Sequence, residues 1–470
     1  MTKVGTDSNP LRVAIVGAGP SGFYVADHLF RHETLVVEVD MFDRLPTPHG
    51  LVRGGVAPDH QKIKSVTKMF DRTAASPHFR FYGNVDIGNH VDLSDLKQHY
   101  HQICFTTGAQ TDRQLGIPGE DLVRSYSATE FVRWYNGHPD CRDCEFDLAC
   151  KRVAVIGVGN VAIDVARILC RTPLELADTD IADYALEALL DSKVKEVYLL
   201  GRRGPAQAAF TNPEIKELGE LQGADIMTIA EEVELDDLSR QSLEDNPDQM
   251  AIRKVEILQS YASQELSDKP RKLVIRFFVS PVELIGNEAG QVVALRLARN
   301  ELYSTEAGTL RSRPTDQFEE LPVGVVFRSV GYRGVPLPGV PFNEKWGVIW
   351  NKDGRVIDPD TQCPLVGEYT AGWIKRGPTG VIGTNKPDAA ETVACMLEDV
   401  ENGQILDPSR PDVTAAEQLV RDCQPDYFTY ADWLRLNQME IARGRAAGRP
   451  RVKFTCVKHM LEALGRSPHV

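Results

Sequence analysis

One stretch of the chain, residues 11–44, constrains the fold more than any other. Apolar β-formers at 13–16 lead into a glycine-rich turn, and an amphipathic segment with helical spacing follows. A second apolar run begins at Leu35 and ends on the acidic residue Asp43. A strand, a glycine turn, a helix and a second strand ending in an acid predict a dinucleotide-binding βαβ unit. The turn consists of Gly17, Ala18, Gly19, Pro20, Ser21 and Gly22.

Each glycine of this turn has its own task in such a unit. Gly17 permits the sharp exit from the strand, Gly19 lets the backbone approach a pyrophosphate, and Gly22 lets the helix lie close on the strand. The start of the helix then offers free N–H groups and a partial positive charge to the phosphates. Asp43 can accept hydrogen bonds from a ribose diol and repels a 2′-phosphate. The first unit therefore suits FAD or NAD better than NADP.

The same pattern starts again at Arg152. A strand over 153–156 meets a second glycine turn and a helix, and after a polar insertion the next strand ends in Arg202 and Arg203 rather than in an acid. Two guanidinium groups at the ribose 2′ position can clamp a phosphate bidentately, so the second unit is predicted to bind NADP(H). The alternative is a solvated turn. The glycine turn consists of Gly157, Val158, Gly159, Asn160, Val161 and Ala162.

Length and composition narrow the class of protein. A chain of 470 residues is too long for one compact core, so two or three domains are expected. A net charge of −14 argues against general binding to nucleic acid or to anionic membranes. No apolar run reaches the roughly 20 residues that span a bilayer, and residues 1–10 lack a signal-peptide pattern. We therefore expect a cytoplasmic protein with no membrane insertion.

The order of the segments predicts one domain inserted into another. A buried strand that ends near Gly108 completes the first unit, and we interpret the buried strand that follows Leu321 as the return to that domain. The fold class is therefore α/β, with two Rossmann-like domains and the boundaries 1–108, 109–322 and 323–470. Antiparallel strands are expected within 272–302, and helices that pack on the first domain from Asp407 onward.

Two loops are candidates for the binding site. Prolines and glycines within 44–61 disfavour regular structure, and long irregular stretches are often binding loops. Leu51, Val52 and Val56 can cover an aromatic ring, although ordinary packing would also explain them. His60 is the side chain of this loop whose charge can change near neutral pH, and it is either catalytic or structural.

The second loop is the glycine-rich stretch GWIKRGPTGVIGT. A helix is expected to begin near Val381 or beyond Pro387. The positive end of such a helix could face the pyrimidine edge of a flavin, where negative charge appears on reduction, or the stretch is simply a loop.

The cysteines form one cluster, Cys141, Cys144 and Cys150. A single CxxC with one further cysteine lacks the second pair that a structural zinc site needs, so no metal is expected. A dithiol role for Cys141 and Cys144 stays an alternative, and the segment CRDCEFDLAC matches no motif of the family named below.

Five motifs in this order resemble one family. GPSGFYVADHL, HGLVRGGVAPDH, GVGNVAIDVARIL, GRRGPAQAAFT and GWIKRGPTGVIGT are similar to the adrenodoxin reductase type of ferredoxin–NADP reductase, including its actinobacterial members. The resemblance implies a two-domain flavoprotein in which non-covalent FAD takes hydride from NADPH and passes electrons singly to a ferredoxin. Those electrons would supply redox enzymes such as haem monooxygenases.

The resemblance also implies roles for single residues, transferred by matching motif. His60 and Asp164 would lie near the nicotinamide as positioning or proton-handling groups. Asp43 departs from the family, whose members commonly have Glu there, so its reach to the ribose is shorter. FAD contacts are implied for Ser21, Asp43, Leu51, Val85, Trp373, Gly380, Val381 and Ile382. NADP contacts are implied for Gly159, Asn160, Val161, Arg202, Arg203, Glu214 and Gly380.

The expected partner is a separate ferredoxin, because the cysteines form no series able to hold an iron–sulfur cluster. A monomer is expected. Lys62, Lys64, Lys68 and Arg72 have helical spacing and form a candidate docking patch for an acidic ferredoxin, or else a solvated helix face. Two other function classes stay open: an NADPH-dependent dithiol reductase, and a nucleotide-binding subunit of an electron-transfer complex.

Overall fold

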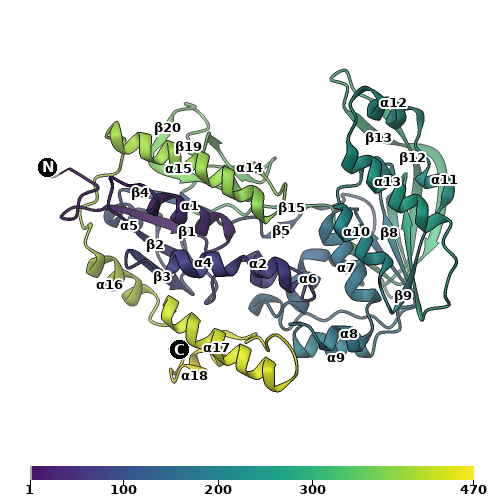
Figure 1. The fold of residues 1–470 in the computed structure, drawn as a ribbon, viewed down its shortest axis with the longest axis horizontal. Coiled ribbons are helices and arrows are strands. Elements are labelled where there is room, and N and C mark those ends of the chain that lie inside the picture. Colours follow the sequence, from purple (N-terminus) through teal and green to yellow (C-terminus); the bar gives the residue numbers. More distant parts are fainter. Residues whose placement is uncertain (1–2, 470) are drawn as a thin grey trace.

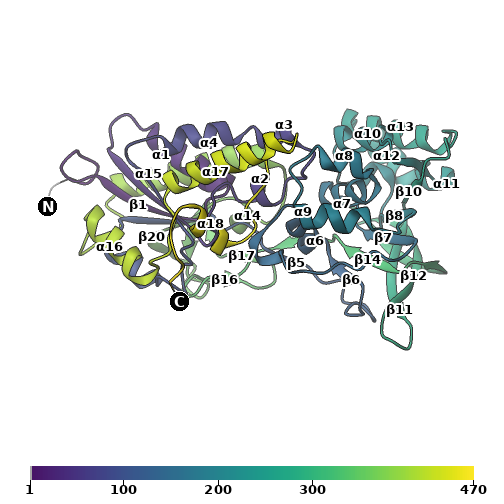
Figure 2. The same cartoon turned by 90° about the horizontal axis from the view of Figure 1, so that it is seen from below.

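The computed structural model describes residues 3–469, which form two α/β domains side by side along the long axis of the molecule (Figures 1 and 2). The first domain contains a seven-stranded sheet in the order β18-β19-β20-β4-β1-β2-β3, and the second a six-stranded sheet in the order β6-β14-β7-β8-β10-β9. The predicted fold class, α/β with two nucleotide-binding domains, is confirmed.

The first sheet is parallel from β20 to β3 and has an antiparallel edge, β18-β19. All six residues of β1 are buried, as expected for a central parallel strand with helices on both faces. Its strands are β1 (Leu11–Val16), β2 (Val37–Asp43), β3 (Phe79–Gly83), β4 (Gln102–Phe105), β18 (Asn351–Lys352), β19 (Arg355–Ile357) and β20 (Pro364–Thr370). Its helices are α1 (Pro20–Phe30), α2 (Leu51–Gly54), α3 (Gln61–Lys64), α4 (Thr67–Ala74), α5 (Leu93–His99), α14 (Trp373–Arg376) and α15 (Asn385–Glu401).

The strands of the second sheet are all parallel to their neighbours. They are β6 (Ser125–Ser127), β7 (Arg152–Ile156), β8 (Glu196–Leu200), β9 (Ala224–Thr228), β10 (Arg271–Arg276) and β14 (Val325–Arg328). The helices of this domain are α6 (Ala128–Tyr135), α7 (Asn160–Cys170), α8 (Pro173–Ala177), α9 (Asp183–Leu190), α10 (Asn212–Gly219), α11 (Ala230–Val233), α12 (Asp237–Asp245) and α13 (Gln249–Ala262).

A separate antiparallel sheet, β11-β12-β13, extends from the second domain. It consists of β11 (Val279–Gly286), β12 (Val292–Ser304) and β13 (Leu310–Pro322). The antiparallel pairing expected within 272–302 holds for β11 and β12, whereas β10 lies in the parallel sheet. The polar strand β13 was not predicted, because most of its side chains are exposed and give no apolar alternation.

The chain crosses between the domains twice. β5 (Thr111–Asp112) and β15 (Tyr332–Arg333) pair with each other at this crossing. β14 belongs to the second sheet, so sheet membership places the return to the first domain after Arg328 and not at the predicted residue 322. Two further short strands, β16 (Phe342–Asn343) and β17 (Val348–Ile349), form a hairpin in the returning segment.

The C-terminal part contains α16 (Val413–Cys423), α17 (Tyr430–Ala446) and α18 (Val457–Ala463). These helices lie in the three predicted helical runs, and α17 packs beside the first domain, drawn in yellow in Figure 1. The segment after α17 also touches the second domain. Lys453 Nζ donates to the carbonyl oxygens of Arg53 in the first domain and Asn136 in the second, at 3.4 and 3.1 Å.

No helix within residues 3–469 has both the length and the apolar composition needed to cross a membrane.

Candidate functional site

The β1–α1 turn, residues 17–22, is called the first cradle here. Gly17 has φ of 112°, and a Cβ there would lie 2.6 Å from the carbonyl oxygen of Thr106, so only glycine fits. A Cβ on Gly19 would meet nothing within 4 Å, which leaves the backbone open on its outer side. No side chain caps the N-terminus of α1. Free amides beside an open backbone fit the diphosphate of a dinucleotide.

Asp43 lies at the end of β2 and is hydrogen-bonded to the first cradle. Its two carboxylate oxygens accept hydrogen bonds from the amides of Ala18 and Leu45, at 2.7 and 2.8 Å. Burial raises the pKa of Asp43, although both amides oppose that shift. The carboxylate is therefore bonded to the loop itself, and any ribose must use its remaining lone pairs.

The β7–α7 turn, residues 157–162, is the second cradle and repeats this geometry. Gly157 has φ of 129°, and a Cβ there would collide with the carbonyl oxygen of Ser329. Gly159, like Gly19, has open space where a Cβ would be. Asn160 Oδ1 accepts a hydrogen bond from the amide of Thr211 at 3.0 Å, which joins the cradle to the loop before α10.

Arg202 and Arg203 follow β8, beside the second cradle. Arg202 is exposed and Arg203 is half-buried, and within residues 3–469 neither guanidinium forms an ion pair. Burial and the neighbouring charge of Arg202 lower the pKa of Arg203. Two adjacent cations without a carboxylate partner fit an anionic ligand such as the 2′-phosphate of NADP.

The glycine-rich loop before α15 faces the domain crossing. A 3-10 turn over Ile382–Thr384 leads into α15 at Asn385, between the two predicted starting points. The buried indole Nε1 of Trp373 has no hydrogen-bond partner among the described residues, and the centroid of its ring lies 5.5 Å from that of Tyr332, with the two rings tilted by 32°. An orphaned buried donor fits a ligand with acceptor atoms, such as a flavin ring.

The other residues implied for FAD differ in exposure. Leu51 and Val56 are half-buried, and Val85 is buried in the core of the first domain. Val381 is exposed and Ile382 is half-buried. The loop that carries Leu51 contains the four-residue helix α2, where the sequence predicted no regular structure.

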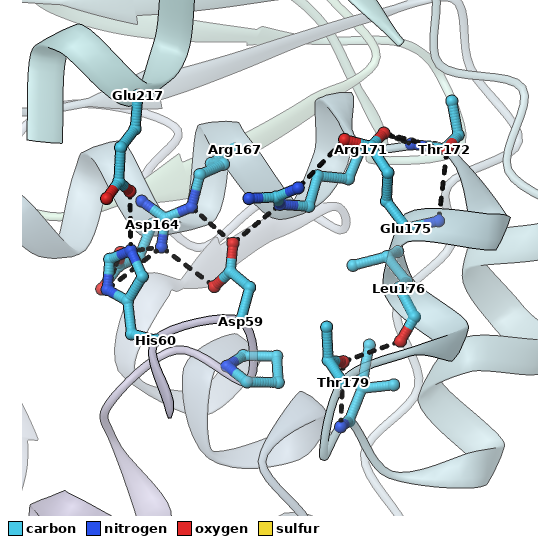
Figure 3. A network of polar contacts seen from close by, with 12 residues as sticks. Asp59, His60, Asp164, Arg167, Arg171, Thr172, Glu175, Leu176, Thr179 and Glu217 are labelled. Carbon is cyan, nitrogen blue, oxygen red and sulfur yellow. Dashed lines mark hydrogen bonds and ion pairs between the residues drawn. The ribbon is translucent and has the colours of Figure 1, made fainter. Parts of the chain in front are cut away.

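A polar network joins the two domains between the cradles (Figure 3). Its centre is Arg167 of α7, whose side chain is fully buried. The guanidinium donates to Asp59 of the first domain at 2.7 Å, to Asp164 at 2.6 Å and to Glu214 of α10 at 3.1 Å. Arg171, one turn further along α7, also donates to Asp59 at 2.7 Å. Asp59 is thus one of the points where the first domain binds the second.

The carboxylates of this network differ in their electrostatics. Burial alone would raise the pKa of Asp59, but Arg167 and Arg171 together lower it well below its usual range. Burial raises the pKa of Asp164 in spite of Arg167, and burial together with the charge of Asp164 raises that of Glu214. One arginine cannot compensate all of its acidic neighbours.

His60 is the next residue after Asp59 and faces α10 and α7. Its Nε2 lies 2.9 Å from Glu217 Oε2 and 3.9 Å from Glu214 Oε2, and its Nδ1 lies 4.0 Å from Asp164 Oδ1. The structure therefore brings together His60, Asp164 and Glu214, all predicted site residues. Sequence reasoning missed Glu217, which the i, i+3 spacing from Glu214 on one helix could have revealed.

The candidate docking patch needs a correction at Lys64. Lys64 Nζ donates to both carboxylate oxygens of Asp180 at 2.7 and 2.9 Å, and its side chain is nearly buried. It is therefore a structural link between the domains and offers no charge to a partner. Lys62, Lys68 and Arg72 are exposed.

The CxxC pair packs against the aromatic core of the second domain. Cys141 is buried, and Cys144 packs against the same cluster, which includes Phe131 and Trp134. Burial raises the pKa of Cys141 to about 12. Almost no thiolate exists at neutral pH under these conditions, which argues against the dithiol reductase alternative.

Comparisons with known proteins agree with this geometry. Residues 11–216 match the family model of pyridine nucleotide-disulphide oxidoreductases. NADPH-ferredoxin reductase FprA of Mycobacterium tuberculosis (strain ATCC 25618 / H37Rv) is 44% identical over 467 residues, 96% of this chain and 98% of the relative. Mitochondrial NADPH:adrenodoxin oxidoreductase of Homo sapiens is 39% identical over 469 residues, which cover 98% of this chain and 93% of the relative. The structure of Mycobacterium tuberculosis FprA in complex with NADPH has a TM-score of 0.91 and 44% identity, and the match covers 97% of this chain and all of that one.

Proposed function

We propose a function from one premise: the chain belongs to the NADPH-ferredoxin reductases of the adrenodoxin reductase type. It is an FAD-dependent oxidoreductase that carries electrons from NADPH to a ferredoxin. The observation that carries this function is the pair of cradles, one ending in a carboxylate and the other in two unpaired guanidinium groups. FAD, when bound, supplies the hydride and single-electron chemistry.

We assign the two cofactors by the charge at the end of each second strand. The first cradle binds the diphosphate of FAD at the N-terminus of α1, and Trp373 offers its free indole N–H to the flavin side of the site. The second cradle binds the diphosphate of NADPH, and Arg202 with Arg203 binds its 2′-phosphate. Glu214 lies at the nicotinamide end.

The polar network around Arg167 fixes the position of the two domains relative to each other. Hydride transfer needs near-contact distances between the two rings, so the relative placement of the domains controls the rate. Asp59 fixes the first domain to α7, and His60 reaches α10 through Glu217. His60 and Asp164 then position the nicotinamide or hold a proton beside it, and no side chain is needed as a nucleophile.

The electron acceptor is a separate ferredoxin, and the exposed Lys62, Lys68 and Arg72 form our revised docking patch. This patch lies on α3 and α4, which continue from the loop that carries His60. Cytoplasmic location, a monomeric state and a role in supplying haem monooxygenases stay predictions.

The test is steady-state reduction of cytochrome c through an added ferredoxin. We expect a yellow purified protein, dependence on the ferredoxin, and a strong preference for NADPH over NADH. A colourless protein would contradict the assignment of the first cradle, and a preference for NADH would contradict that of the second. Dye reduction by the isolated chain with NADPH would also exclude a purely structural electron-transfer subunit.

A further inference from the structure

We propose that His60, Glu214 and Glu217 form an inhibitory binding site for a transition-metal dication such as Zn²⁺. The side chains belong to different domains, because His60 precedes α3 and the two glutamates lie on α10. Within residues 3–469, these three offer one nitrogen and two oxygen atoms that all lie within 4.8 Å of one another. The site goes beyond the proposed reductase function, which needs no metal.

The spacing of the three ligand atoms suits a tetrahedral ion. Zinc with bonds of about 2.1 Å holds its ligand atoms about 3.4 Å apart. His60 Nε2 lies 2.9 Å from Glu217 Oε2 and 3.9 Å from Glu214 Oε2, so the two distances bracket that value. Small side-chain rotations would close the site, and water would supply the fourth ligand.

The opposite side of the imidazole also has the environment of a metal ligand. His60 Nδ1 faces Asp164 Oδ1 at 4.0 Å, while Nε2 faces the two glutamates. Histidines that bind metals commonly direct their second ring nitrogen toward a carboxylate, which fixes the ring and increases its basicity. In the structure Nδ1 lies nearer to Arg167 Nη2, at 3.5 Å, than to Asp164. A small turn of the ring toward Asp164 would place the proton on Nδ1 and leave Nε2 free for the ion.

The surroundings contain more carboxylates than guanidinium groups, and Figure 3 shows Asp59, Asp164 and Glu217 near Arg167. Four carboxylates, those of Asp59, Asp164, Glu214 and Glu217, lie around two guanidinium groups. One of these groups, Arg171, also pairs with a fifth carboxylate, that of Glu175, at 3.0 Å. A dication at the free edge of the cluster would reduce this imbalance, and the imidazole would favour zinc over Mg²⁺, which prefers oxygen ligands.

Bound Zn²⁺ would inhibit the enzyme because of the place that it occupies. The ion would connect the first domain to α10 and occupy the place where we expect the nicotinamide to enter beside Glu214. We therefore expect Zn²⁺ to inhibit NADPH-dependent ferricyanide reduction competitively with NADPH. A chelator should reverse the inhibition, and Mg²⁺ at the same concentration should have no effect.

The decisive measurement is equilibrium dialysis of the FAD-loaded protein against Zn²⁺, which does not depend on activity. We expect one zinc-binding site that is lost at millimolar NADP⁺. Glu217→Gln should weaken zinc binding about tenfold or more, because it removes a charged ligand. Glu220→Gln is the matched control, since Glu220 is an exposed acid at the C-cap of the same helix, and it should leave zinc binding unchanged.

A second variant covers the case in which Glu217→Gln fails to fold. Glu217→His keeps a metal ligand and should retain tight zinc binding. The proposal is overturned if the wild-type protein binds no zinc at millimolar concentration, or if Glu217→Gln binds zinc as tightly as the wild type does. Either result would leave the reductase assignment intact, because that is tested without metal.

Discussion

The two cradles have the same backbone geometry and differ in the side chains at the end of the strand that follows each of them. Gly17 and Gly157 both have positive φ, and Gly19 and Gly159 both leave their outer side open. Asp43, however, accepts hydrogen bonds from the amides of Ala18 in the first cradle and Leu45 in its own loop, whereas Arg202 and Arg203 have no acidic partner within residues 3–469. The shared turn thus accounts for dinucleotide binding in general. We propose that the strand end determines which dinucleotide each cradle binds.

The largest expected effect comes from removing the arginine pair. Arg202→Ala with Arg203→Ala should lower the preference for NADPH over NADH by about 3 kcal/mol, roughly a hundredfold, because hydrogen bonds between charged groups are worth about 1.5–3 kcal/mol each. The measurement is kcat/KM with both nucleotides. Arg202→Lys with Arg203→Lys keeps the charge without the bidentate geometry, so its preference for NADPH should lie between those of the wild type and the alanine variant. An unchanged preference would remove the distinction between the cradles.

The second prediction concerns Asp180 of the second domain, which pairs with Lys64 of the first domain and with Lys453 after α17. Burial would raise the pKa of Asp180, but Lys453 and Lys64 lower it to about 2. The folded-state pKa lies below the usual value of about 3.9, so this carboxylate contributes stability above about pH 4. That contribution, about 2 kcal/mol, should be lost as the pH falls from 4 towards 2.

Urea unfolding between pH 5 and pH 2.5 measures this loss. Lys453→Met should make the dependence of unfolding free energy on pH shallower, because it removes one of the two cations beside Asp180. Identical slopes in the variant and the wild type would show that Lys453 does not lower the pKa of Asp180.

The third prediction concerns Asp43, whose carboxylate already accepts hydrogen bonds from two backbone amides. Asp43→Asn keeps the shape but turns one acceptor into a donor that faces an amide, which leaves buried N–H groups unpaired. We expect a loss of about 1.5 kcal/mol in unfolding free energy, together with a lower FAD content after purification. Thermal unfolding and the flavin-to-protein absorbance ratio measure these changes. Asp7→Asn, at an exposed site of the same domain, is the control.

The smallest effect is expected at the docking patch. Lys68→Glu with Arg72→Glu should lower kcat/KM for ferredoxin about threefold and flatten its dependence on salt, because charges at an interface rim act mainly on association. Ferricyanide reduction should not change. Lys193→Glu, an exposed site on the second domain, provides the comparison. Equal ferredoxin kinetics in all variants would place docking elsewhere.

Sequence reasoning succeeded where the signal is local. Within each unit, the glycine turn and the charged end of the following strand lie within about 45 positions of each other, and the turn chemistry fixes the geometry of the cradle. The place of β14 could not be predicted, because a short apolar strand fits either parallel sheet equally well. The hydrogen bonds of Asp43 also require the folded turn.

The failures at the domain interface have a different cause. Lys64 has the pattern of an exposed helix face, and only contact with Asp180, 116 positions away, buries it. His60 and Glu217 are separated by 157 positions. Such pairs depend on how two domains meet, and helical or strand periodicity contains no information about that meeting.

Lys453 adds a contact from the C-terminal segment to those that hold the two domains together. The chain itself crosses between the domains at β5 and β15, which pair with each other. Asp59 and Lys64 join the domains through ion pairs, and the ammonium group of Lys453 donates to one carbonyl group in each domain, those of Arg53 and Asn136. A rotation of one domain against the other therefore has to break a contact made by the C-terminal segment as well as those made by the domains themselves.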